Sequence, residues 1–199
     1  MELLDVLLQN LVLIMELNYT QNSATIGAYT RLNLEENTIS IMGYEYSAFY
    51  SVLRPRFTTG VMYGQINSDT QGGISGSVAD SLGLSTIVRS VSNMNMYRNN
   101  SLIDSSINTS GAIQSWHTNV KYLILASDDG NGPRDFTRNQ VSSAFIGGTL
   151  TAADVSTMYL ATNAYLNAVS PELIVNGGFD STLSPWGQAA TSWQWQCNS

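Results

Sequence analysis

The segment SDDGNGPRD, residues 127–135, gathers the side chains in this sequence that are best suited to metal binding. Asp128, Asp129, Asn131 and Asp135 bring carboxylate and amide oxygens to a glycine-containing loop, and Ca²⁺ takes oxygen ligands of these kinds. The spacing differs from an EF-hand loop, because the glycine and the terminal glutamate of that motif are missing. These four residues are our candidate calcium site, and a solvated turn is the alternative.

Hydrolytic chemistry makes stricter demands, and we predict that the chain is not an enzyme. Glycoside hydrolases use two carboxyl groups about 5–10 Å apart, which a strand provides when two acids alternate along one face. Glu35-Glu36 precedes a turn residue and most other acids are isolated, so no predicted strand carries such a pair. A Ser–His–Asp triad or a His-based zinc site would depend on His117, the single histidine. We therefore expect no catalytic residues.

Sugar recognition needs exposed aromatic faces beside amides and carboxylates. Trp116 and His117 lie in a polar stretch and are the first candidates, and Tyr97 and Asn99 on a predicted hairpin are the second pair. These four residues form the predicted ligand site. The alternatives are partial burial of Trp116 against a sheet, and core or cross-strand packing of the strand tyrosines.

The charge balance excludes some partners. The formal net charge is −7, and only 12% of the residues are charged. A nucleic-acid-binding protein needs a basic stripe for the phosphates, whereas the eight Lys and Arg residues here are scattered, so we expect no nucleic-acid partner. The single cysteine, Cys197, allows no intrachain disulfide. A polar, weakly charged composition of this kind is typical of extracellular and virion β-proteins.

Residues 1–17 are apolar but match neither a signal peptide nor a membrane span. Glu2 and Asp5 stand where a signal peptide needs positive charge. Polar residues interrupt the span of about 20 apolar residues that a bilayer requires. Leucines at helical spacing and the apolar run 11–15 predict a helix-like lead over 1–10 followed by a strand over 11–19. A helix that forms oligomers is the alternative.

The elements that must position these candidates are short apolar segments separated by polar turns, which is an all-β pattern. It predicts an antiparallel sandwich or jelly roll, with residues 68–83 as a long loop. Asn99-Asn100 predicts a two-residue hairpin with a type I′ turn. The predicted strands are 24–32, 38–46, 48–54, 57–66, 84–90, 93–98, 101–105, 120–126 and 140–147.

One helix is predicted over 151–169. Thr151 is its N-cap, with Asp154 three residues later in a variant capping box, and Leu150 and Val155 form a hydrophobic staple. Pro171 ends it. Its apolar face at 3.6-residue spacing predicts packing on a sheet; the face consists of Val155, Met158, Tyr159, Thr162, Tyr165, Leu166 and Val169.

Three segments in order resemble a known domain family. They are the hairpin MYRNNSLIDS (96–105), the strand YLILAS (122–127) and the closing turn SAFIGGTLTAADV (143–155). Together they resemble the second half of concanavalin A-like and laminin G-like jelly-roll domains of bacteriophage tail or bacterial surface proteins. The resemblance covers about residues 20–169. It implies an antiparallel β-sandwich, binding through edge loops, and calcium at one edge.

The composition changes after Ser170. Residues 171–180, followed by Trp186, resemble the opening strand of a carbohydrate-binding module. We therefore predict three parts: a lead segment over 1–10, a concanavalin A/laminin G-like sandwich over 11–169, and the truncated start of a second β-domain or tail over 170–199.

From these patterns we predict a non-catalytic binding or adhesion module of a virion or cell surface. Its expected partner is a glycan or host surface polysaccharide. We expect no membrane span. A homo-oligomer formed through a parent protein is a further hypothesis for its partners. A structural virion sandwich without a ligand is the first alternative, and a glycoside hydrolase is the second. A glycan array separates the first two hypotheses, and the distance between carboxyl groups in a cleft tests the third.

Overall fold

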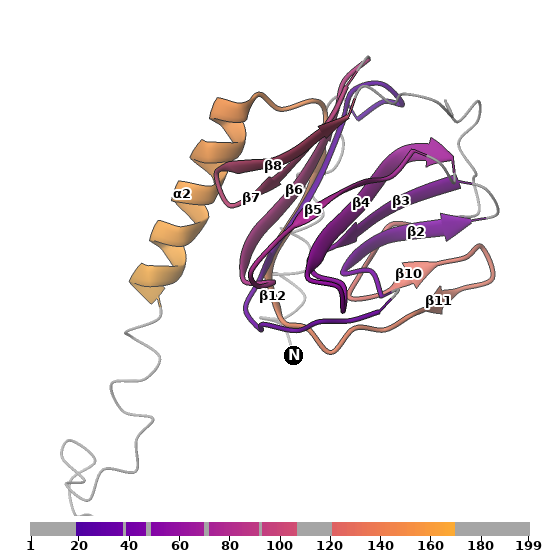
Figure 1. Cartoon of the computed structure of the whole chain (residues 1–199), viewed down its shortest axis with the longest axis horizontal. Helices are drawn as coiled ribbons and strands as arrows, with labels where there is room; N and C mark the ends of the chain where they lie inside the picture. Colours follow the sequence, from indigo (N-terminus) through magenta and orange to yellow (C-terminus); the bar gives the residue numbers. More distant parts are fainter. Residues whose placement is uncertain are drawn as a thin grey trace, which may run out of the picture. The chain divides into compact units, whose positions relative to one another are not determined.

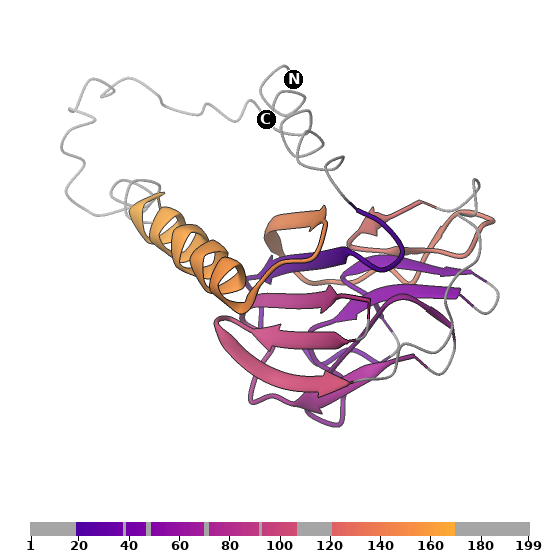
Figure 2. The same cartoon turned by 90° about the horizontal axis from the view of Figure 1, so that it is seen from above.

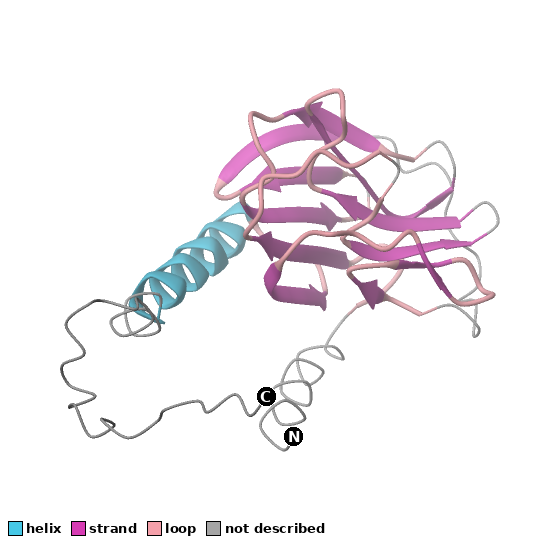
Figure 3. Cartoon of the chain, turned by 90° about the horizontal axis from the view of Figure 1, so that it is seen from below, coloured by secondary structure: helices cyan, strands magenta, loops and turns pink. Residues whose placement is uncertain are grey.

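A computed structural model describes residues 19–37, 39–46, 49–69, 72–91, 93–106 and 121–169. Within these residues the chain is mostly β-structure, with two five-stranded antiparallel sheets and one helix (Figures 1 and 3). The all-β prediction with a C-terminal helix is confirmed at this level. The predicted lead over 1–10, most of the predicted strand over 11–19, and the tail over 170–199 lie outside the described residues.

The first sheet has the order β12-β1-β6-β7-β8. Its strands are β1 (Ala24–Thr30), β6 (Gly83–Arg89), β7 (Met94–Arg98), β8 (Ser101–Ser106) and β12 (Val141–Gly147). β1 lies between two strands from distant parts of the chain, so that Ile26 faces Ile87 on one side and Ile146 on the other. All seven residues of β6 are buried. Successive side chains of a strand point to opposite faces, so both faces of this sheet are covered at β6.

The second sheet has the order β5-β4-β3-β2-β9. Its strands are β2 (Met42–Tyr46), β3 (Phe49–Arg54), β4 (Val61–Asp69), β5 (Ile74–Ser77) and β9 (Leu123–Ile124). β2 to β5 follow one another as an antiparallel meander, and β9 joins the free side of β2. A short ribbon of β10 (Ser127–Asp128) and β11 (Pro133–Arg134) follows β9.

The two sheets share one apolar core and form a β-sandwich (Figure 2). Ile26, Ile87 and Met96 contribute to this core from the first sheet. Leu53 and Met62 contribute from the second, and all five side chains are fully buried. The sheets approach closely at Gly64 of β4, where a Cβ atom would lie 1.7 Å from Cδ1 of Ile87. This glycine gives Ile87 the space it occupies between the layers.

β5 corrects the prediction of a long loop over 68–83. Ile74 is 2% exposed and pairs with Gly64, and the strand runs beside β8, where Gly76 lies against Ile103. Glycines are depleted in strands because they lack a side chain to pack, and this depletion led to the loop prediction. Here their small size permits the close approach of the two sheets at this edge.

The β7–β8 hairpin is confirmed, but its turn differs from the predicted type I′. Arg98 pairs with Ser101, which leaves Asn99 and Asn100 as a two-residue connection. Asn99 has φ of +58°, whereas Asn100 does not have a positive φ. A positive φ at the first central residue alone is the sign pattern of a type II′ turn, and type I′ needs it at both.

The helix α2 (Ala152–Val169) begins where the capping box predicts. The Asp154 backbone N–H donates to Thr151 Oγ1 over 3.2 Å, and Asp154 Oδ2 accepts from the Thr151 N–H over 2.9 Å. Val155 is 1% exposed and packs with Leu150 against Val88, on the outer face of the first sheet. The staple residues thus attach the first turn of the helix to the sheet.

The chain divides into two compact units, Met1–Leu160 and Ala161–Ser199, so only the first half of α2 belongs to the sandwich unit. Tyr165 of the second unit is 65% exposed. Among the described helical residues, none form a segment long and apolar enough to cross a bilayer.

Candidate binding site

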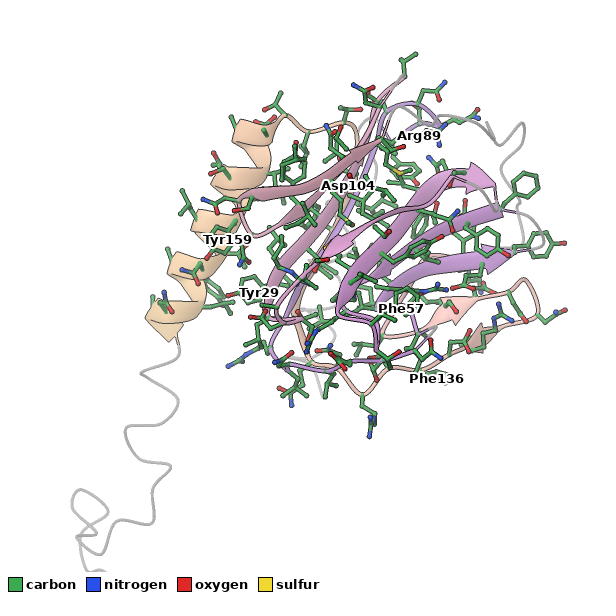
Figure 4. All side chains as sticks on the ribbon, in the orientation of Figure 1. Tyr29, Phe57, Arg89, Asp104, Phe136 and Tyr159 are labelled. Atoms are coloured by element: carbon green, nitrogen blue, oxygen red, sulfur yellow. The ribbon has the colours of Figure 1, made fainter. Side chains whose placement is uncertain are left out.

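A pocket of about 340 Å³ lies at the edge where β5 runs beside β8. Its lining comes from residues 77–80 after β5, residues 98–101 of the β7–β8 hairpin, Ile103 of β8 and Tyr159 of α2. Figure 4 labels Tyr159, which lies on the side of the helix toward the strands. Three segments that are distant in sequence, two connections and a helix, therefore meet at one place, and all the lining residues belong to the sandwich unit.

The β7–β8 turn is held in place by Asn99. Its backbone N–H donates to the Leu84 carbonyl, and its side-chain Oδ1 accepts from the Leu84 N–H over 2.9 Å. Gly83 has φ of +91°, and a Cβ at this position would lie 2.1 Å from Asn99 Oδ1. The amide therefore fits only beside a glycine, and the pair fixes the turn against β6.

Arg98 links backbone segments beside the pocket through hydrogen bonds. It is 8% exposed, and its guanidinium donates to the carbonyls of Ser81 and Leu82 over 3.0 and 3.4 Å and also to the Pro55 carbonyl. Burial lowers the pKa of Arg98 to about 10, so the side chain remains a cation at neutral pH. The buried Nε atom has no hydrogen-bond partner among the described residues.

The rim of the pocket is polar. Asp80 is half-buried, and one of its carboxylate oxygens accepts from the Leu82 N–H over 2.9 Å. Ser77, Asn100 and Ser101 are exposed and add two hydroxyls and an amide. A half-buried aromatic ring, Tyr159, completes the lining. Amide, hydroxyl and carboxylate groups beside an aromatic side chain can hold a hydroxyl-rich small molecule.

The predicted ligand residues are placed differently from one another. Asn99 lines the pocket, whereas Tyr97 is 6% exposed and packs with Val88 and Val155 under the start of α2. The buried Tyr97 ring therefore has a packing role here. Trp116 and His117 lie outside the described residues. Sequence reasoning missed Asp80, Arg98 and Tyr159 as lining residues.

In the predicted calcium loop, the side chain of Arg134 lies close to several carboxylates. The Arg134 guanidinium lies 3.6 Å from a Glu45 carboxylate oxygen, 3.7 Å from one of Asp129 and 3.3 Å from one of Asp135. Glu45 also pairs with Arg54. Three carboxylates thus converge on a guanidinium that neutralises part of their charge.

Backbone N–H groups donate to carboxylate oxygens of Asp128 and Asp129. Asp128 is 4% exposed, and its two oxygens accept from the N–H groups of Lys121 and Gly130 over 2.9 and 2.8 Å. Asp129 accepts from the Asn131 N–H over 2.8 Å in a second turn of the same kind. Among the described residues, no three His, Cys, Asp or Glu side chains are grouped so as to hold a metal ion.

Comparison with known proteins found no family model that matches this chain and no curated protein that matches it.

Proposed function

We propose that the chain is a non-catalytic binding or adhesion module that recognises a glycan at the pocket beside the β7–β8 turn. The observation that carries this proposal is the pocket itself. The connection after β5, the β7–β8 turn and helix α2 present amide, hydroxyl, carboxylate and aromatic groups around a volume of about 340 Å³, which is within the usual size of small-ligand sites. Loops and turns on such a scaffold are common binding surfaces.

The lining favours holding a glycan over cleaving one. Glycoside hydrolysis uses two carboxyl groups on opposite sides of the scissile bond, and Asp80 is the one carboxylate among the described lining residues. A purely structural sandwich is the remaining rival, and a binding measurement would distinguish the two, because a structural role predicts no ligand at the pocket.

For the fold, we propose a jelly roll of the concanavalin A type. Several features support it: β1 and β12, from opposite ends of the domain, are neighbours, two meanders form most of the two sheets, and a capped helix follows β12. The weakly charged composition supports a place on a virion, such as a phage tail, or on a cell surface. Fold alone does not determine function, so the proposal depends on the pocket.

A glycan array probed with the full chain, with calcium and with a chelator, tests the function. Asn100→Ala removes an exposed amide from the rim of the pocket and should weaken binding to any bound glycan. Asn93→Ala is the matched control, because Asn93 is also an exposed asparagine in a connection of the first sheet, at the other end of β7. The control should bind as the unaltered chain does.

Two results would contradict the proposal. An array without any bound glycan in either condition would leave the structural role as the better account. Equal loss of binding in the Asn93→Ala and Asn100→Ala variants would move the site away from the β7–β8 turn.

A further inference from the structure

We propose that the sugar unit entering this pocket carries a carboxylate, as a uronic acid does, and that Arg98 is the residue that recognises it. The inference rests on the proposed glycan-binding function and adds the chemical class of the ligand. It starts from a buried cation beside a pocket that has no carboxylate within ion-pair distance among the described residues, although the charge of Asp80 acts on it from farther away.

The contacts of Arg98 stabilise its position, and its charge is balanced only in part, by the more distant carboxylate of Asp80. Its two terminal nitrogens donate to backbone carbonyls, its Nε has no partner among the described residues, and no described carboxylate lies within ion-pair distance. Carbonyl dipoles neutralise a cation less completely than an anion does, and a buried charge without an ionic partner is costly.

Other arginines of the sandwich differ from Arg98 in their ionic partners or in their position. The four that form ion pairs each lie within 4.0 Å of a carboxylate of this chain; these are Arg54, Arg56, Arg134 and Arg138. Arg89 is also buried, but it reaches the Ile66 and Asn67 carbonyls in the interior and does not line the pocket. Arg98 thus combines burial, a position on the pocket and, among the described residues, no carboxylate within ion-pair distance.

A carboxylate of a bound sugar would give Arg98 the direct ionic contact that Asp80 does not make. A charge-assisted contact is shorter and stronger than a neutral one. The net charge of −7 gives an acidic sugar no general attraction to this protein. A preference for an acidic sugar over its neutral analogue would therefore report a local contact.

Removing the charge of Asp80 should affect the binding of acidic sugars and of neutral sugars differently. Its carboxylate lines the same pocket and raises the pKa of Arg98 by its charge, but it lies beyond ion-pair distance from the guanidinium. It would repel a bound carboxylate, whereas it would accept a hydrogen bond from a neutral sugar. Asp80→Asn should therefore strengthen binding of an acidic sugar, and it should leave unchanged or weaken binding of a neutral one.

The experiment compares methyl β-D-glucuronide with methyl β-D-glucoside, which differ only at C6, by NMR titration of the full chain. We expect the glucuronide to bind about ten-fold more tightly, as one hydrogen bond to a charged group allows. Asp80→Asn should tighten glucuronide binding by about three-fold, the effect of removing one like charge several ångströms away in a high dielectric. Asp129→Asn changes the net charge equally outside the pocket and is the matched control.

Arg98→Gln should abolish the preference for the glucuronide, but it also removes three contacts to backbone carbonyls. If the Arg98→Gln variant does not fold, the result for Asp80→Asn tests the inference alone. Equal or tighter binding of the glucoside would overturn the inference and leave glycan binding intact. Weaker glucuronide binding in the Asp80→Asn variant would overturn it as well. If neither glycoside binds but the array returns bound glycans, the inference fails and the proposed function stands. If the array is also empty, both fail.

Discussion

Replacing Gly64 by alanine should force the two sheets apart at one identified contact. The new Cβ would lie 1.7 Å from Cδ1 and 2.9 Å from Cγ1 of Ile87, a fully buried side chain on the opposite sheet. Carbon atoms in contact keep about 3.5–4.0 Å apart, so the Cδ1 methyl would have to move by about 2 Å. Overpacking of this kind costs about 1–3 kcal/mol of the free energy of unfolding.

A second substitution shows whether that contact is the cause. Ile87→Val removes the nearest atom and alone should cost about 0.5–1.5 kcal/mol. In the double variant the alanine methyl occupies the space that Cδ1 has left, so we expect its stability to lie within about 1 kcal/mol of that of the Ile87→Val variant. The loss of unfolding free energy in the double variant should therefore be smaller than the sum of the losses in the two single variants.

Urea unfolding followed by tryptophan fluorescence or circular dichroism measures all four stabilities. Gly147→Ala is the control, because a Cβ at this strand glycine has no atom within 4 Å. It should change stability by at most about 0.5 kcal/mol. Additive costs for Gly64→Ala and Ile87→Val, or a cost for Gly147→Ala as large as that for Gly64→Ala, would refute the face-to-face packing described above.

Three further predictions concern the helix, the buried tyrosines and the turn. Thr151→Ala removes the N-cap and should lower the free energy of unfolding by about 1 kcal/mol in urea titrations; no change would exclude the capping role. Burial raises the pKa of Tyr19 and of Tyr122, whose hydroxyls share a hydrogen bond. Because the folded state keeps these protons more tightly, stability should be complete below about pH 10 and fall as the pH rises above it. Melting temperatures across that range should fall less in Tyr122→Phe, and an equal fall would count against the tyrosines. Asn99→Ala should destabilise by more than Asn99→Gly in thermal unfolding, since alanine keeps the strain of a positive φ and both lose the bond to Leu84; the reverse order would contradict this.

Local signals in the sequence predicted much of the fold because they act over a few residues. The capping box at Thr151 and Asp154 and the Asn99-Asn100 hairpin depend on neighbours in the chain, and both are confirmed as elements. β5 was missed because its pairing with β4 and its contact with Ile103 are set by tertiary packing. Its own sequence, ISGS, has little strand propensity.

The pocket was harder to predict because it joins segments that are far apart in the sequence. Asn99 was identified as a ligand candidate. Asp80 precedes β6 in the sequence and Arg98 follows it, and no local pattern indicates that these two charges line one pocket. Tyr159 was interpreted as part of an apolar helix face, and its place on the pocket follows only from how the first turns of α2 lie on the sheet. In the acidic loop, the spacing of the aspartates suggested calcium, whereas the contacts of Arg134 depend on Glu45, a distant residue.

The most direct test of the central proposal is to locate a bound glycan on the chain. Backbone amide resonances of the labelled protein would be followed while an array-positive glycan is added. We predict that the shifts concentrate at residues 77–80 and 98–101, around the pocket. Shifts concentrated at residues 127–135, or no shifts from any glycan, would contradict it.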